Sequence, residues 1–232
     1  MQVILFGATG MVGQGVLREC LLDPEVVTVL SLVRTPTGQR HEKLREIVRH
    51  DVSDLSAIEA DLSGYDACFF CLGVSSVGMA EPEYRRITYD LTLSAAGTLA
   101  AGNPDMTFVS GTGTDSAGRS MWARVKGETE NALLRLPFKA AYMFRPGYIQ
   151  PMHGVTPKTR WVKLVYGVVG PLYPVLRRLV PQYVTTTECM GRAMINVAKR
   201  GAPQRVLESR TSTKLVRRDK EAPADDRYLL AM

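Results

Sequence analysis

Short apolar runs alternate along the chain with segments whose apolar residues recur at helical spacing. The first run, residues 2–6, stops at Gly7 and is typical of a buried parallel strand. Further strands are predicted at residues 26–33, 45–49, 66–74, 105–113 and 140–149. Helices are predicted at residues 11–22, 56–64, 81–101 and 122–135. This repeated alternation predicts an α/β fold with a Rossmann-like, doubly wound parallel sheet.

The pattern changes in the last third of the chain. Residues 158–184 are basic, apolar and interrupted by prolines, whereas residues 185–200 have helical spacing. Residues 211–232 are charged and lack periodicity, which is typical of a mobile tail. We therefore predict a single domain at residues 1–210 and a tail at 211–232. Within the domain, residues 157–184 would form a small C-terminal lobe on the substrate side, or a lid.

The composition, 45% hydrophobic and 22% charged, is ordinary for a globular protein. The first ten residues do not resemble a signal peptide, and no run of about 18 apolar residues predicts a transmembrane helix. Four unevenly spaced cysteines do not suggest a disulfide framework. This usage favours a reducing compartment, and we predict a cytoplasmic location.

The formal net charge of +6 is distributed unevenly. Residues 1–156 hold 14 Lys and Arg against 17 Asp and Glu, whereas residues 157–232 hold 15 against 6. Such a basic region could meet a membrane surface or nucleic acid. We interpret it as a solvated face and predict no nucleic-acid partner. Arg177 and Arg178 lie among apolar residues, so peripheral membrane contact stays an alternative to a lid or a subunit contact.

A glycine pattern follows the first predicted strand and opens the first predicted helix. Gly7, Gly10 and Gly13 are spaced as Gly-x-x-Gly-x-x-Gly. In this context the glycines permit a tight turn, a close approach of the backbone to a pyrophosphate, and close packing of the helix on the sheet. We predict that this loop binds a dinucleotide, although a strand–helix turn without a ligand is the alternative. The predicted cofactor loop also includes Thr9, Met11 and Val12.

The end of the second predicted strand carries the signal for the type of cofactor. The strand ends at Arg34, and no carboxylate follows until Glu42. A carboxylate there would hold the ribose 2′-hydroxyl of NAD, whereas a guanidinium pairs with a 2′-phosphate. We therefore predict NADP(H) in preference to NAD(H), the alternative being a solvated arginine. Asp51 is expected near the adenine or in a turn, and Leu72 with Gly73 beside the ribose and nicotinamide.

Five segments together resemble an atypical member of the short-chain dehydrogenase/reductase superfamily. They are GATGMVG at 7–13, CLG at 71–73, VSGTG at 109–113, VKGETE at 125–130 and FRPG at 144–147. The chain is similar, over roughly residues 2–200, to the branch of Tat-interacting oxidoreductase-like and epimerase-like NAD(P)-binding proteins. The resemblance implies a dinucleotide cofactor and hydride transfer with a small carbonyl substrate.

The same resemblance implies a catalytic set. The hydroxyl that orients the substrate carbonyl corresponds to Ser110 or Thr112, and the lysine that holds the nicotinamide ribose corresponds to Lys126. The family's catalytic tyrosine precedes that lysine by four residues, and here the position is occupied by Trp122. An indole N–H only donates a hydrogen bond and cannot replace an acidic phenol.

Three interpretations of Trp122 are open. The protein could be a reductase with another proton source, for which Asp115, Tyr148 and His153 are the candidates. It could instead be a non-catalytic NADP(H)-binding sensor that regulates a partner. The third interpretation is that residues 122–126 form an ordinary helix outside the family register.

Other chemistry-bearing residues favour structural roles. Cys68 and Cys71 are spaced as Cys-x-x-Cys, but they fall within a predicted strand, where we expect a core position rather than a redox pair. His41 and His50 are expected to be solvated, and we predict no metal site. The oligomeric state is left open by the sequence.

Overall fold

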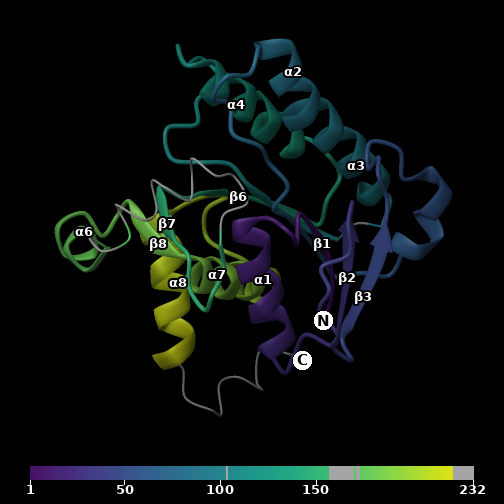
Figure 1. Cartoon of the computed structure of the whole chain (residues 1–232), viewed down its shortest axis with the longest axis horizontal. Helices are drawn as coiled ribbons and strands as arrows, with labels where there is room; N and C mark the ends of the chain where they lie inside the picture. The colour runs from purple at the N-terminus through teal and green to yellow at the C-terminus, as the bar shows by residue number, and fades with distance from the viewer. Residues whose placement is uncertain (103, 157–169, 171–172, 222–232) are drawn as a thin grey trace.

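A seven-stranded, all-parallel sheet forms the centre of the protein (Figure 1). The computed structural model describes residues 1–102, 104–156, 170 and 173–221. The strand order is β3-β2-β1-β4-β5-β6-β9. The strands are β1 (Gln2–Phe6), β2 (Thr28–Val33), β3 (Leu44–Val48), β4 (Ala67–Phe70), β5 (Asp105–Val109), β6 (Ala140–Arg145) and β9 (Val206–Glu208). The predicted fold class is confirmed, and β9 is a strand that the apolar pattern did not predict.

The order of the strands reverses beside β1. The chain runs from β1 outward to β3 and then returns to β4 on the other side of β1. In the register, Phe6 at the end of β1 pairs with Leu32 of β2 and with Phe70 of β4. The loop after Phe6 therefore lies between the carboxyl ends of two neighbouring strands, the position at which open α/β sheets bind ligands.

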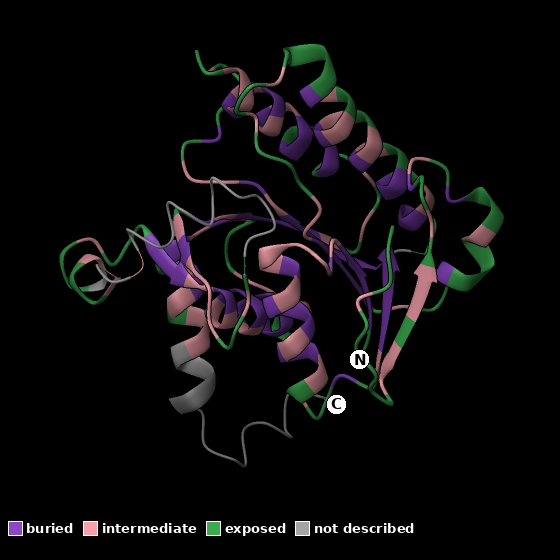
Figure 2. Cartoon of the chain, viewed as in Figure 1, coloured by how far each residue is buried: buried purple, intermediate pink, exposed green. Residues whose placement is uncertain are grey.

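Helices cover both faces of the sheet (Figures 1 and 2). One layer contains α1 (Met11–Leu22), α7 (Thr187–Arg200) and α8 (Ser209–Glu221). The other contains α2 (Glu81–Arg85), the π-helical turn η2 (Arg86–Asp90), α3 (Leu91–Ala100) and α4 (Met121–Leu133). The side chains of β1 alternate between the two layers: Val3 and Leu5 join one buried cluster, and Ile4 and Phe6 join the other.

Two of the predicted elements differ in the structure. The strand predicted at 140–149 is broken: β6 ends at Arg145, and β7 (Tyr148–Gln150) pairs with β8 (Val184–Thr186) in a separate two-stranded sheet. The break lies at Gly147, where an added Cβ would approach the Tyr183 carbonyl oxygen to 2.3 Å. The short helix near residue 56 is the 3-10 helix η1 (Ser56–Leu62).

Residues 211–221, which the sequence analysis assigned to a mobile tail, belong to the helix α8. Leu215 and Val216 pack against the buried cluster beneath α7, and the Ser212 hydroxyl donates to the Glu208 carbonyl at 3.3 Å. Two adjacent apolar residues are too few to show a helical period in the sequence. The helix is therefore recognised only in the structure, where it packs against α7. Residues 222–232 lie outside the described part of the chain.

The predicted lid at 157–184 falls largely outside the described residues. Its described part includes α6 (Tyr173–Leu179), which projects from the body of the protein, and the start of β8 (Figure 1). In the described residues no helix is long and apolar enough to cross a membrane.

Candidate functional site

The glycine loop has the tight geometry that its spacing predicted. Gly7 has a φ of +81°, and a Cβ on it would approach the Cys71 carbonyl carbon to 2.7 Å. A Cβ on Gly13 would lie 2.0 Å from the Gly7 carbonyl oxygen. The turn is closed by the Gly10 amide, which donates to the Gly7 carbonyl at 2.9 Å. Side chains are therefore excluded where the loop, α1 and the end of β4 converge.

The N-terminus of α1 offers its first amides without competition from the protein. Gly10 is the extended N-cap residue, no side chain caps the helix, and the first turn contains no carboxylate. The amides at the start of a helix have no intrahelical acceptor and carry its partial positive charge. The loop residue Thr9 is held by its carbonyl, which accepts from Gln14 Nε2 at 3.1 Å. This cradle fits a phosphate group.

Two adjoining cavities extend the cradle into a groove along the carboxyl edge of the sheet. The first, of about 480 Å³, is lined by Gly7, Thr9, Gly10 and Met11 together with the end of β2 and the loop after β4. The second, of about 720 Å³, continues past Asp51 to the start of α3. The residues that line both cavities are Arg34, Val52, Leu72, Gly73 and Val74. The predicted cofactor residues Arg34, Asp51, Leu72 and Gly73 are therefore brought together.

The larger cavity is lined by two arginines, Arg34 and Arg86, by two aspartates, Asp51 and Asp90, and by His50. The Arg34 side chain is exposed and makes no hydrogen bond or ion pair with any residue in the described ranges. The Asp51 carboxylate accepts from the Ser53 amide at 2.8 Å, and its hydrogen bonds with Ser53 lower its pKa. Asp51 thus stabilises the turn, as the alternative interpretation expected, while lining the cavity. Arg86 of η2 lines the same cavity and was missed by the sequence analysis.

Ser110, which follows β5 and lines neither of these two cavities, is engaged in a buried polar network. Its hydroxyl lies within hydrogen-bonding distance of the Glu130 carboxylate and, at 3.2 Å, of the Phe144 carbonyl oxygen. Glu130, which is 2% exposed, also accepts from Arg145 Nε at 3.1 Å. Glu130 and Arg145 were not predicted as site residues. The position of Glu130 four residues after Lys126 on one helix was the signal that could have revealed it.

Thr112 is also held by the protein. Its hydroxyl donates to the Arg145 carbonyl at 3.0 Å, with the Glu208 carboxylate 3.3 Å away as a second acceptor. A hydroxyl has one proton to donate. The two hydroxyls predicted to orient a substrate carbonyl are therefore both directed to acceptors within the protein.

Lys126 lies on α4 beneath these residues. Its Nζ donates to the carbonyl oxygens of Ser110 at 2.9 Å and Val109 at 3.3 Å. No carboxylate pairs with it among the described residues, because Glu130 is engaged by Arg145 and Ser110. Burial lowers the pKa of Lys126 to about 8, and the nearby charge of Glu130 opposes the shift.

Trp122 lies one helical turn before Lys126, against the turn that ends β5. Its Cζ3 and Cη2 atoms are 3.8 and 3.6 Å from the positions that a Cβ would take on Gly111 and Gly113, respectively. The indole is half-buried. The glycines at 111 and 113 therefore leave one of its edges in contact with backbone rather than with side chains.

The three alternative proton sources are in different surroundings. The Asp115 side chain is exposed and accepts from the Ala117 amide at 2.9 Å. His153 lies 2.9 Å from Glu188 of α7, near the opposite layer of helices. The Tyr148 hydroxyl donates to Gln150 Oε1 at 2.8 Å, and burial raises its pKa. Tyr148 alone follows the β6 end directly, two residues after Pro146, whose carbonyl accepts from the Thr112 amide.

The cysteine prediction is confirmed for Cys68, which is fully buried in β4. Cys71 follows the strand and lines the groove, and burial raises the pKa of both thiols. His41 and His50 are exposed, as expected. No group of three or more His, Cys, Asp or Glu residues that could hold a metal ion occurs in the described part of the chain.

The glycine-rich turn lies at the switch point of a parallel sheet and opens a helix beside an elongated groove. These features are those of the Rossmann class of nucleotide-binding folds. No protein-family model matches the chain. Solved structures show the same fold: MoeE5 in complex with UDP-glucuronic acid and NAD superposes with a TM-score of 0.65 at 18% identity, covering 89% of this chain and 75% of that one. A short-chain dehydrogenase family protein from Francisella tularensis has a TM-score of 0.62 at 13% identity, covering 86% and 91%.

Sequence comparison finds more specific relatives. The fmp52 protein of Emericella nidulans is 27% identical over 203 residues, 84% of this chain and 85% of that protein. Protein HTATIP2 of Rattus norvegicus is 26% identical over 151 residues, 63% of this chain and 62% of that protein. The chain is thus a distant sequence relative of the FMP52 and HTATIP2 proteins. The resemblance seen in the sequence is thus confirmed.

Proposed function

We propose that the protein binds NADP(H) in the groove and acts as an oxidoreductase on a small carbonyl compound. The pyrophosphate would lie on the amides at the start of α1, with the adenosine in the cavity of about 720 Å³ beside Arg34 and Asp51. The nicotinamide half would extend past Gly73 toward Lys126. When bound, the reduced nicotinamide supplies a hydride. Solved neighbours of the same fold, such as MoeE5, are described as complexes with NAD, which supports a dinucleotide in this position.

The observation that carries the proposal is that one groove holds both an uncapped helix N-terminus and Arg34, which has no partner among the described residues. The first group fits the pyrophosphate that NAD and NADP share. The second fits the 2′-phosphate that only NADP has, because a guanidinium pairs with phosphate through two N–H groups.

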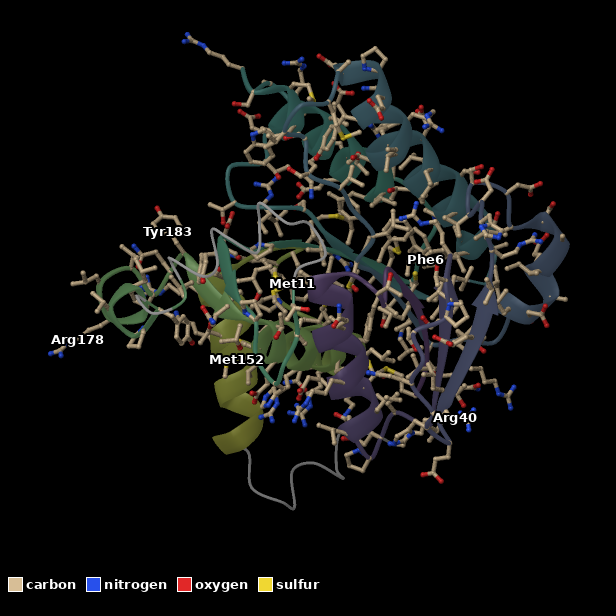
Figure 3. The ribbon with its side chains drawn as sticks, in the orientation of Figure 1. Phe6, Met11, Arg40, Met152, Arg178 and Tyr183 are labelled. Atoms are coloured by element: carbon tan, nitrogen blue, oxygen red, sulfur yellow. The ribbon has the colours of Figure 1, made fainter. Side chains whose placement is uncertain are left out.

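The test compares NADPH and NADH by fluorescence titration. Losing one charge-assisted hydrogen bond costs about 2 kcal/mol, so Arg34→Ala is expected to weaken NADPH about 30-fold and to leave NADH nearly unchanged. Arg40→Ala is the matched control, because Arg40 is equally exposed but lies away from Met11 and the groove (Figure 3). Equal affinities for the two cofactors, or equal losses in the Arg34 variant, would refute the role of Arg34.

A non-catalytic NADP(H) sensor is the second candidate. The observation in its favour is that Ser110 and Thr112 are engaged by the protein while Trp122 occupies the tyrosine position. The two candidates share the cofactor groove and differ in turnover. Tight NADPH binding with no NADPH oxidation across a panel of aldehydes, ketones and quinones would decide for the sensor.

The cellular location is part of the proposal. A cytoplasmic location rests on the cysteine usage alone and stays a prediction, and four free cysteines are consistent with a reducing compartment. The FMP52 relatives are named as mitochondrial proteins. Localising the full chain with a C-terminal fluorescent tag would separate the two compartments.

A further inference from the structure

Among the described residues, the two candidate hydroxyls and the indole of Trp122 do not supply the acid that reduction of a simple ketone requires. A hydride added to a ketone leaves an alkoxide, an oxyanion about as basic as hydroxide and far more basic than a phenolate. A positioned acid therefore accelerates such a step by about 10²–10⁴-fold. Here Ser110 and Thr112 donate within the protein, and Trp122 replaces the phenol.

Lys126 offers a further donor beside Ser110. Its ammonium has three protons, and two are directed to the carbonyls of Ser110 and Val109. In the ranges that the structure describes, no third acceptor lies within hydrogen-bonding distance. The pKa of about 8 makes this ammonium a better acid than an exposed lysine. It is still far too weak an acid to be matched to an alkoxide.

A quinone presents a different demand. Its two-electron reduction gives a hydroquinone anion, which is a phenolate, and a phenol has a pKa of about 10. Such an anion persists in water and is close in basicity to Lys126. The chemistry left in this site is therefore matched to an acceptor whose reduced form is a stabilised oxyanion.

The indole of Trp122 also restricts the shape of the acceptor that the site can bind. Its indole rests on the turn at Gly111–Gly113, is half-buried, and shares a face of α4 with Lys126 because the two residues are four apart. An indole offers a flat surface on which planar conjugated rings stack, and it makes no comparable contact with a puckered saturated ring.

We propose that the acceptor half of the site binds a quinone on the indole of Trp122, with Lys126 as the proton donor to the reduced oxyanion. The inference rests on the proposed NADP(H) function and specifies its substrate class. The quinone takes one hydride, that is two electrons and one proton, from the reduced dinucleotide, and the resulting monoanion takes its second proton from the Lys126 ammonium. Solvent then reprotonates Lys126.

The first test measures binding without turnover. Duroquinone is the probe, because its fully methylated ring has no free position for cysteine to attack, and cyclohexane-1,4-dione is its saturated counterpart with the same two carbonyls. With NADP⁺ present, duroquinone is expected to quench tryptophan fluorescence saturably in the wild type. In a competition assay, Trp122→Phe should still bind duroquinone, whereas Trp122→Ala should bind it about tenfold more weakly. Cyclohexane-1,4-dione should bind neither to the wild type nor to these variants.

The second test measures NADPH oxidation without oxygen, against blanks that lack protein. The wild type is expected to reduce duroquinone at least 100-fold faster than the dione. The rate should fall above about pH 8, where Lys126 loses its proton, and Lys126→Met should lower the rate and remove that fall. Trp122→Tyr should raise the rate with the dione, whereas Leu134→Tyr, which adds the same phenol at an exposed position, should not.

The outcomes separate this inference from the function on which it rests. Failure of NADPH to bind would overturn both. NADPH binding with neither quenching nor reduction of duroquinone would overturn the quinone proposal and leave the cofactor site standing. Equal rates with duroquinone and the dione would likewise overturn it, because they would show that the site supplies a strong acid.

Discussion

The pKa of Lys126 has a consequence for stability that needs no ligand to measure. The folded protein holds this amine among backbone carbonyls, with no carboxylate partner in the described part of the chain, and burial lowers its pKa from 10.5 to about 8. Below pH 8 the folded and unfolded chains both carry the proton. Between pH 8 and 10.5 the folded chain releases it while the unfolded chain keeps it, so this residue makes the folded state more stable as pH rises.

Replacement of Lys126 by Met isolates the effect, because Met keeps an unbranched stem and cannot ionise. With a Lys126 pKa of 10.5 in the unfolded chain and about 8 in the folded chain, the unfolding free energy of the wild type should rise by about 2.5 kcal/mol relative to that of Lys126→Met between pH 7 and pH 10. This is an upper value, because the side chain retains some contact with water. The two hydrogen bonds lost in the variant, about 1 kcal/mol each, add an offset that does not depend on pH.

The assay is urea unfolding of both proteins at intervals from pH 7 to pH 10, with the difference in unfolding free energy plotted against pH. Leu133→Ala is the control on the same helix, because Leu133 is fully buried and does not titrate. Its cost of about 2–5 kcal/mol should stay constant across the range. A difference for Lys126→Met that is equally flat would refute the assignment of Lys126 as a buried, unpaired cation.

Three further predictions concern other parts of the molecule. Gly13→Ala should abolish NADPH binding and lower the unfolding free energy by about 1–3 kcal/mol, because its Cβ would lie 2.0 Å from a carbonyl oxygen. The control Gly97→Ala, on an open helix face, should be neutral or stabilising in thermal unfolding. Glu130→Gln should lower the unfolding free energy measured in urea by about 3–5 kcal/mol, because it leaves the partly buried charge of Arg145 unpaired. Arg124→Gln, which breaks a more exposed ion pair, should lower it by less than about 1 kcal/mol. Leu215→Asp should destabilise the protein by about 1–2 kcal/mol, and no change in its melting curve would show that α8 contributes nothing to the fold.

The sheet and the cofactor loop were predictable because their signals are local. A buried parallel strand is a short apolar run, and a glycine is required wherever a Cβ would collide with backbone. Gly7 and Gly13 meet that condition in the structure, and Arg34 follows β2 as expected. The strand β9 and the helix α8 escaped prediction because each is held by contacts with distant elements, β6 and α7, rather than by a pattern of its own.

The catalytic half of the site shows where local signals stop. The sequence places Ser110, Thr112 and Lys126 at the positions of a hydride-transfer site and Trp122 where an acid would be expected. It cannot say which acceptor a hydroxyl proton meets, because Phe144 and Arg145 approach Ser110 and Thr112 through the pairing of β5 with β6, and Glu130 approaches Ser110 from the helix α4.

The sequence by itself therefore determined the class of fold, the glycine loop after β1, the basic residue after β2 and the missing phenol, because each depends on residue identity at a spacing of a few positions. Tertiary structure alone decided that both candidate hydroxyls are engaged and that Lys126 has no counter-ion among the described residues. The physical reason is that hydrogen-bond partners and desolvation depend on groups brought together from strands and helices far apart in the chain, and these set the chemistry of a side chain as much as its identity does.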